Sequence, residues 1–223
     1  MSNVIEFQAW PKTPRLFRDI TITEKIDGTN AAVQIVKAEG DLNLACENVP
    51  AFATVVVTEG AGAPDFEGSA VYYVAAQSRK RLIKVGDDNF GFAAWVADNR
   101  HELVQILGEG THYGEWWGSG IQRGYGLVKG EKRFSLFNVH RYSDLVEVEG
   151  VHQLVGLDVV PTLYQGPLST FVINGVLDRL EANGSEAAPG FGKPEGVIVY
   201  HSASRSVFKA LLENDAQPKG LAA

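Results

Sequence analysis

A lysine with polar neighbours lies in the segment 24–30, which reads Glu-Lys-Ile-Asp-Gly-Thr-Asn. The amine of Lys25 can act as a nucleophile once it has lost its proton, and the nearby carboxylate of Asp27 and amide of Asn30 can help to orient it. A rigid strand end would hold such an amine in one place. The segment therefore predicts a nucleophilic lysine or, as the simpler interpretation, a surface turn with one exposed lysine.

Two short strands are expected on either side of this lysine. Residues 20–23 and 32–36 alternate between apolar and polar side chains, with the period of half-buried strands. Between them, the dipeptide Asp27-Gly28 is a turn signal, because glycine adopts positive φ without steric cost. The pattern predicts a β-hairpin that presents Lys25 near its turn.

The rest of the chain reads as strands with inserted helices. Further β-rich runs lie at residues 41–45, 53–58, 71–76, 111–118, 133–139, 196–200 and 206–211. Apolar residues with helical spacing predict helices at 92–107 and 169–182. The glycine-rich segment 118–130 is interpreted as a mobile loop. Because strands outnumber helices and do not alternate with them strictly, we expect an α+β fold with mainly antiparallel sheets.

The composition is that of a globular protein without stabilising crosslinks. The chain has 223 residues, 45% of them apolar, and can form one large or two small domains. Cys46 is the single cysteine, which excludes an intrachain disulfide and a cysteine-based zinc site. No apolar run is long enough to span a bilayer, and the N-terminus lacks the features of a signal peptide. A cytoplasmic location without membrane association is therefore expected.

The net charge of −7 argues against a protein held on nucleic acid by a broad basic surface. It leaves room for a local basic groove. Residues 79–84 and 129–133 contain the two basic clusters that could line one, although each can equally be a solvated surface.

Several short motifs occur in a fixed order along the chain. They lie at residues 25–28, 78–79, 113–118, 134–138, and 195–199 followed by 207–209. In this order they resemble the motifs of the covalent nucleotidyltransferases, the superfamily of ATP- and NAD-dependent polynucleotide ligases and mRNA capping enzymes. Asn30 after Lys-x-Asp-Gly-Thr, together with Ser78-Arg79, looks most like the RNA-ligase branch that includes the second RNA ligase of T-even phages and the kinetoplastid editing ligases. Any one motif is weak, but the ordered set extends over nearly the whole chain.

The resemblance implies a fold and a reaction. The fold would be the ATP-grasp-like nucleotidyltransferase core of polynucleotide ligases, forming one adenylation domain over residues 1–223 with no C-terminal OB-fold or other accessory domain. The reaction would use ATP and Mg²⁺, with Mn²⁺ as an alternative metal, to join a 5′-phosphate to a 3′-hydroxyl of RNA. A partner subunit or an oligomer is not indicated by the sequence.

The same resemblance assigns catalytic roles. Lys25 would attack the α-phosphate of ATP and hold AMP through a phosphoramidate bond. Because an ordinary lysine is protonated at neutral pH, nearby cations must lower its pKa, and Arg79 and Lys209 are the expected ones. Glu195 would bind the metal ion. All four residues are expected to contact the nucleotide.

Four further residues are implied to bind the nucleotide. Glu115 would contact the ribose or lie near a metal, and its simpler interpretation is a strand carboxylate facing water. Phe137 would stack on adenine, unless it is a core aromatic and Phe134 takes that place. Asn30 would donate hydrogen bonds to a phosphate or sugar, or cap the turn. Glu24 would lie beside the base, through its side chain or its backbone.

The chain departs from the family pattern at three positions. Leu211 stands where a second lysine commonly follows Lys209, Tyr200 where a lysine often closes the Glu-Gly motif, and Asn138 where an aspartate is frequent. The missing lysine puts the rate of self-adenylylation in doubt more than the fold. It also leaves open a nucleotide- or RNA-binding module that has lost turnover. Two further alternatives are a minimal ATP-dependent DNA ligase, which shares the first motif, and a capping-type guanylyltransferase.

Overall fold

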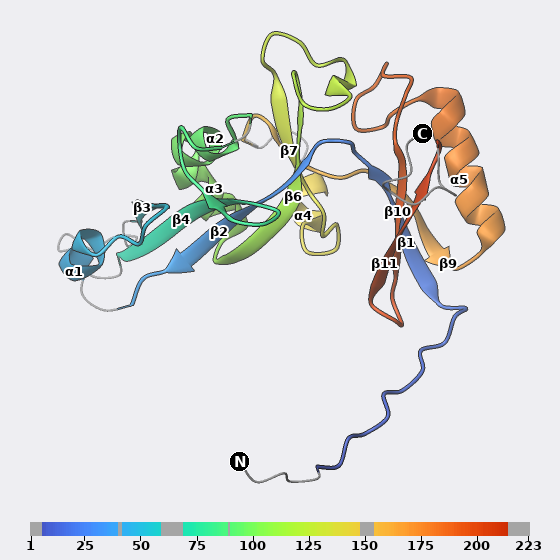
Figure 1. Ribbon diagram of the computed structural model, residues 1–223, viewed down its shortest axis with the longest axis horizontal. Coiled ribbons are helices and arrows are strands. Elements are labelled where there is room, and N and C mark those ends of the chain that lie inside the picture. Colours follow the sequence, from blue (N-terminus) through green and yellow to red (C-terminus); the bar gives the residue numbers. More distant parts are fainter. Residues whose placement is uncertain (1–5, 40–41, 59–68, 89, 148–153, 214–223) are drawn as a thin grey trace.

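Two β-sheets form the frame of the protein in the computed structural model, which describes residues 6–39, 42–58, 69–88, 90–147 and 154–213 (Figure 1). In these residues, the larger sheet has the order β3 (Ala53–Thr58), β4 (Ala70–Ser78), β2 (Thr29–Lys37), β6 (Gly110–Gly118), β7 (Lys132–Leu136) and β8 (Leu157–Val159), with β5 (Leu82–Ile83) paired to β4. The four-stranded sheet has the order β11 (Ser206–Leu211), β10 (Gly196–His201), β1 (Asp19–Lys25) and β9 (Thr162–Pro167).

Helices are inserted between the strands. They are α1 (Leu42–Glu47), α2 (Phe92–Asp98), α3 (Arg100–Leu107), α4 (Ser143–Glu147) and α5 (Thr170–Asn183), with a short 3₁₀ turn η1 at Gly124–Gly126. Among the described strands, every pairing is antiparallel except that of β7 with β8. The predicted α+β fold with mainly antiparallel sheets is confirmed.

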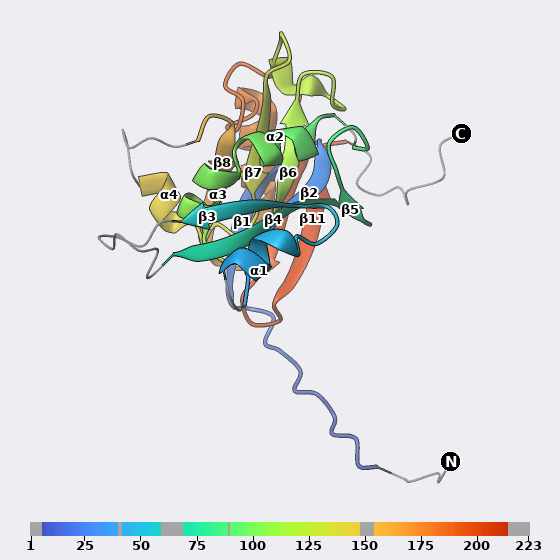
Figure 2. The same cartoon turned by 90° about the vertical axis from the view of Figure 1, so that its left-hand side faces the viewer.

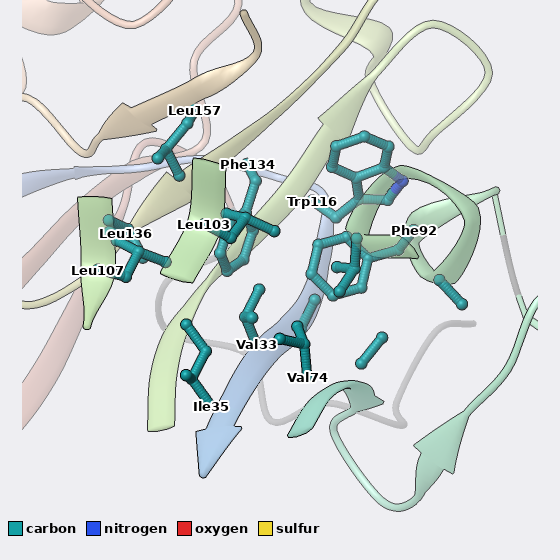
Figure 3. Packing of buried hydrophobic residues seen from close by; sticks show 14 of the residues in the cluster. Val33, Ile35, Val74, Phe92, Leu103, Leu107, Trp116, Phe134, Leu136 and Leu157 are labelled. Carbon is teal, nitrogen blue, oxygen red and sulfur yellow. The ribbon is translucent and has the colours of Figure 1, made fainter. Parts of the chain in front are cut away.

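Each sheet has its own apolar core. On the larger sheet, α2 and α3 pack on the face that carries Val33, Trp116 and Phe134 (Figure 3). On the smaller sheet, α5 packs on Ile20 and Ile22 of β1 and their neighbours on β10. A third cluster combines Ile26 and Val160, from the two segments that join the sheets, with Trp117 of β6, Tyr125 of the loop after β6 and Ala188 of the loop after α5. This third cluster lies beside Lys25 in the chain and therefore supports the region of the candidate site.

Strand β1 divides its side chains between two faces. Ile20 and Ile22 are buried against α5, and the alternation of a strand places Thr21, Thr23 and Lys25 on the opposite face. The hydroxyl of Thr21 lies 3.1 Å from the imidazole Nε2 of His140, a residue that follows β7 of the other sheet. The face of β1 that carries Lys25 is therefore turned towards the larger sheet.

The predicted hairpin is wrong, although both of its strands exist. Strand β1 pairs with β9 and β10, whereas β2 pairs with β4 and β6, so residues 26–28 cross from one sheet to the other. Gly28 is needed for space and not for a turn, because a Cβ atom there would lie 2.5 Å from the backbone oxygen of Trp116 and 2.7 Å from Cβ of Trp117.

Other expectations were corrected in detail. Residues 42–47 form α1 in place of the strand expected at 41–45, of which Asp41 lies outside the described residues. The helix expected at 92–107 is two helices, because Asn99 leaves the helical conformation between them. The helix at 169–182 is confirmed as α5, and the strands at 53–58, 71–76, 111–118, 196–200 and 206–211 are confirmed as β3, β4, β6, β10 and β11. The strand expected at 133–139 exists as β7 but ends at Leu136. Strands β5, β8 and β9 and helix α4 were not foreseen.

Residues 6–18 precede β1 and lead away from the two sheets, as Figure 1 and Figure 2 both show. The aromatic side chains of Phe7, Trp10 and Phe17 in this segment are largely exposed. None of the helices in the described part of the chain is long and apolar enough to cross a membrane.

Candidate functional site

Lys25 is paired with Glu195 at one end of the four-stranded sheet. It is the last residue of β1 and lies opposite Gly196, the first residue of β10, so Glu195 precedes its strand at the same end. The Lys25 ammonium donates to Oε2 of Glu195, and the two side chains are 23% and 15% exposed. The structure thus joins two predicted site residues that lie 170 positions apart in the sequence.

Glu115 comes to this pair from the larger sheet. In the register of β2 with β6, it lies opposite Asn30, and its Oε1 accepts a hydrogen bond of 3.1 Å from the N–H of Gly28. Burial raises the pKa of Glu115 to about 7, the nearby Lys25 ammonium and the Gly28 N–H lower it, and the carboxylates of Glu195 and Asp27 raise it further. Three carboxylates therefore share the surroundings of one amine.

The raised pKa of Glu115 gives a testable dependence of stability on pH. A carboxyl whose pKa is higher in the folded than in the unfolded protein stabilises the fold while it is protonated. That contribution is complete below the ordinary value of 4.5 and is lost as the pH rises through about 7. We expect the free energy of unfolding of the wild type, relative to Glu115→Gln, to fall by about 2 kcal/mol between pH 5 and pH 8, after a discount for solvent screening. Urea unfolding of both proteins at several pH values measures this fall. The prediction is contradicted if the free energy of unfolding depends on pH in the same way in both proteins.

Register places the nucleotide-binding candidates of the larger sheet on one face. Asn30, Glu115 and Ser135 lie opposite one another across β2, β6 and β7. Phe137 follows the end of β7, and its N–H donates to the backbone oxygen of Tyr113, which precedes Glu115 by two residues on β6. Phe137 is 39% exposed and available for stacking. Its alternative for the adenine, Phe134, is fully buried against α2 and cannot stack on a nucleotide.

The two predicted cations lie at the margins of this region. Arg79 follows the last residue of β4, so it lies at the same end of the sheet as Asn30, and it is exposed. Lys209 lies opposite Ile198, which in turn lies opposite Thr23, so it shares a sheet face with Lys25. Neither cation forms an ion pair with another described residue. That they lower the pKa of Lys25 stays a prediction.

The side chain of Glu24 points away from Lys25. It is buried, and its carboxylate accepts hydrogen bonds from the hydroxyl of Ser185 at 2.6 Å and from the N–H groups of Glu186 and Ala187 at 2.8 and 2.9 Å. Burial raises its pKa, and these three hydrogen bonds oppose that rise. Glu24 thus anchors the loop after α5 to β1, and its side chain is not available to the base. A contact of its backbone with the base stays a prediction.

This anchor should be important for stability. We expect Glu24→Ala to lower the free energy of unfolding by about 2–4 kcal/mol, because hydrogen bonds to a buried charged group are lost and their donors are left without an acceptor. Thermal or urea unfolding measures the change. Glu181→Ala, an exposed glutamate of α5, is the matched control and should change stability by less than about 0.5 kcal/mol. Equal stability of the two variants would contradict the anchoring role of Glu24.

The carboxylates near Lys25 have the donor chemistry of a magnesium site. Mg²⁺ takes oxygen ligands, keeps several waters, and is commonly held by one or two carboxylates together with substrate phosphates. Glu195 and Glu115 supply such oxygens. No group of three or more metal-ligating side chains occurs within the described residues. The residues therefore fit a metal that is shared with a nucleotide.

Two residues near Lys25 were missed in the sequence. The segment 118–130 was expected to be a mobile loop, but its Tyr125 is 2% exposed and its Arg123 forms an ion pair with Asp27. No local pattern marks these two residues as neighbours of the lysine motif. The one available signal was the tyrosine between Gly124 and Gly126, since tyrosine is buried more often than the charged residues of a surface loop.

Comparison with known proteins gave one family and one fold. The family model described as RNA ligase matches residues 18–211. Two solved structures of an RNA ligase from Naegleria gruberi match with a TM-score of 0.50 and 17% sequence identity. One is a lysine-to-alanine mutant with ATP and Mn, and the other is an aspartate-to-alanine mutant in the apo form. Each match covers 87% of this chain and 50% or 49% of the other, so this chain spans about half the length of the proteins it matches. No curated protein sequence gave a match.

Proposed function

The chain belongs to the RNA ligase family, and from this premise we propose that it is an ATP-dependent RNA ligase that works through a lysyl-AMP intermediate. In the first step, the Lys25 amine attacks the α-phosphorus of ATP, a P–N bond forms, and pyrophosphate leaves. In the second, an oxygen of an RNA 5′-phosphate attacks the same phosphorus, the P–N bond breaks, and the amine is released. In the third, an RNA 3′-hydroxyl attacks the activated 5′-phosphate, and AMP leaves.

The observation that carries this proposal is the pairing of Lys25 with Glu195 beside Glu115. A nucleophilic amine must be held in place and must lose its proton. An ion pair with a carboxylate holds the amine in place but opposes the loss of its proton. A divalent cation bound by Glu195 would take that carboxylate away from the ammonium and so favour the neutral amine. Mg²⁺ supplies positive charge that offsets the charge of the triphosphate.

The other side chains suit the remaining parts of the nucleotide. Phe137 is exposed, its N–H donates to Tyr113 on β6 near Glu115, and its ring can stack on a purine. Asn30 and Glu115 lie opposite each other and can hydrogen-bond the ribose or a phosphate. Lys209 and Arg79, at the margins, would contact phosphates once ATP is present. These roles are proposals that rest on position.

The Naegleria structures support the choice of nucleotide and metal. That RNA ligase was solved with ATP and Mn, and its two substituted residues are a lysine and an aspartate two positions later. Lys25 and Asp27 have the same spacing in this chain.

A sealing assay tests the function. RNA with a 5′-phosphate and a 3′-hydroxyl, and the corresponding all-DNA substrate, are incubated with the protein, ATP and Mg²⁺, and joined products are separated by size. We expect joining of the RNA. Joining of DNA alone would identify a DNA ligase, and covalent labelling by GTP in place of ATP would identify a capping-type enzyme.

One observation favours a second function. Across β1, β10 and β11, Lys25 lies opposite Gly196, which lies opposite Leu211. Leu211 occupies the place where the family commonly has a second lysine. A missing positive charge there would slow adenylylation. Nucleotide binding without a covalent adduct, at any pH between 6 and 9, would show a binding module that has lost turnover.

A further inference from the structure

Arg123 joins three segments that surround Lys25. Its Nε lies 3.3 Å from Oδ2 of Asp27, two residues after the lysine. Its Nη1 donates to the backbone oxygens of Lys193 at 3.0 Å and Pro194 at 3.4 Å, immediately before Glu195. Its Nη2 lies 3.5 Å from Oε2 of Glu213, which follows β11. The side chain is 28% exposed. One guanidinium thus links the lysine segment to the segment of its ion-pair partner.

The chemistry of arginine suits this arrangement and that of lysine does not. A guanidinium offers five N–H donors in a rigid plane, so it can bind a carboxylate and backbone carbonyls in different directions at once. A lysine ammonium carries the same charge on a flexible stem and is a point donor. Arg123→Lys would therefore keep the charge and lose the simultaneous contacts.

Tyr125 also holds the lysine segment. Its hydroxyl accepts a hydrogen bond of 3.0 Å from the N–H of Asp27 and lies 3.4 Å from the backbone oxygen of Lys25 as a donor. Its ring packs against Trp117 and Phe191, with centroids 5.3 and 4.5 Å away. The backbone on both sides of Ile26 is thereby fixed.

The backbone of Tyr125 is strained. Its φ of 49° is in the left-handed region, which is unfavourable for a residue with a bulky side chain. Such a conformation persists only where the surroundings determine it, and it is found more often at functional sites. Here the surroundings are the contacts with Asp27, Trp117 and Phe191.

Arg123 and Tyr125 lie between β6 and β7, strands of the larger sheet, whereas Lys25 and Glu195 lie at the ends of β1 and β10 in the smaller sheet. We propose that Arg123 and Tyr125 are positioning residues that hold the lysine segment beside the segment of Glu195, so that the Lys25 amine keeps its place for attack. The proposal rests on the proposed function and assigns Asp27 the role of anchor for Arg123. A nucleophile displaced by about 1 Å can lose a factor of about 100 in rate.

The test separates positioning from nucleotide binding. ATP affinity and the single-turnover rate of adenylylation at saturating ATP are measured for the wild type, Arg123→Lys and Tyr125→Phe. Arg141→Lys is the matched control, because Arg141 also donates to two backbone oxygens, those of Thr111 and Glu109, at the opposite end of β6 from Gly118. We expect both site variants to bind ATP within about 3-fold of the wild type and to react about 10- to 100-fold more slowly. The control variant should keep the ATP affinity and the adenylylation rate of the wild type.

A double-mutant cycle tests the proposed anchor. If Arg123 acts through Asp27, Arg123→Lys combined with Asp27→Asn should be little slower than the slower single variant. Wild-type rates in Arg123→Lys and Tyr125→Phe would overturn the proposal. So would rates that are reduced only in proportion to the unfolded fraction, which thermal unfolding at the assay temperature gives.

A second readout does not depend on ligase chemistry. The rate at which an amine-reactive reagent modifies Lys25, followed by peptide mass spectrometry without nucleotide, reports on its ion pair with Glu195. It should rise about 5-fold in Arg123→Lys, because the pair is no longer held together. An unchanged rate would overturn the positioning role. If the modification rates differ in this way but the wild type forms no adduct with ATP, the proposed function is overturned and the positioning role is not.

Discussion

Replacing Lys25 with alanine is expected to abolish covalent labelling of the protein by ATP that carries a radiolabel in its α-phosphate. The phosphoramidate can form only on a nucleophilic amine, and no other lysine amine is paired with Glu195 in the described part of the chain. The signal on a denaturing gel should fall at least about 1,000-fold. RNA sealing that starts from ATP should be lost with it.

Two variants control this experiment. Lys25→Arg keeps a positive charge beside Glu195, but a guanidinium stays protonated and does not attack, so this variant should fold and remain unlabelled. Lys37→Ala removes an exposed lysine at the end of β2 and should be labelled like the wild type. Labelling of Lys25→Ala at the wild-type level would contradict the assignment of the nucleophile.

Substitution of Gly28 by alanine should have the second large effect. The added Cβ would lie 2.5 Å from the backbone oxygen of Trp116, 2.7 Å from Cβ of Trp117 and 3.0 Å from Cγ of Glu115, and two of these neighbours are buried and cannot yield. The segment 26–28 must therefore move, and the hydrogen bond from Gly28 to Glu115 is disturbed. We expect adenylylation to slow by about 100-fold and the free energy of unfolding to fall by about 1–3 kcal/mol.

The matched control is Gly175→Ala in helix α5. A Cβ at Gly175 would meet no atom within 4 Å, and its position inside a helix favours alanine. This variant should be as active as the wild type and about 0.5–1 kcal/mol more stable. Single-turnover labelling and urea unfolding measure both effects. An active, stable Gly28→Ala protein would show that the segment tolerates displacement and that its close packing is irrelevant to the reaction.

The strands could be predicted from local pattern, but their partners could not. Residues 20–23 and 32–36 form strands because their apolar side chains alternate, and this period is visible in the sequence. Which strand pairs with which depends on long-range packing. The Asp27-Gly28 dipeptide favoured a hairpin, whereas glycine is required there for close contact with Trp116 and Trp117.

In the candidate site, too, the residues could be predicted from the sequence but some of their contacts could not. The motifs identified Lys25, Glu115 and Glu195, and the register of the strands brings them together. Alternation along β1 could have shown that Glu24 points away from Lys25, because adjacent residues of a strand face opposite sides. The contacts of Arg123 could not be foreseen, since they join segments about 70 to 100 residues apart along the chain.

The central claim is that the Lys25 amine carries AMP during the reaction. Its most direct measurement is the mass of the peptides of the wild-type protein after incubation with ATP and Mg²⁺, with fragmentation to locate the adduct. We expect one AMP group on the peptide that contains Lys25, attached at that residue, and its removal when RNA with a 5′-phosphate is added. AMP on any other residue, or peptides free of AMP under conditions in which the protein seals RNA, would contradict the account.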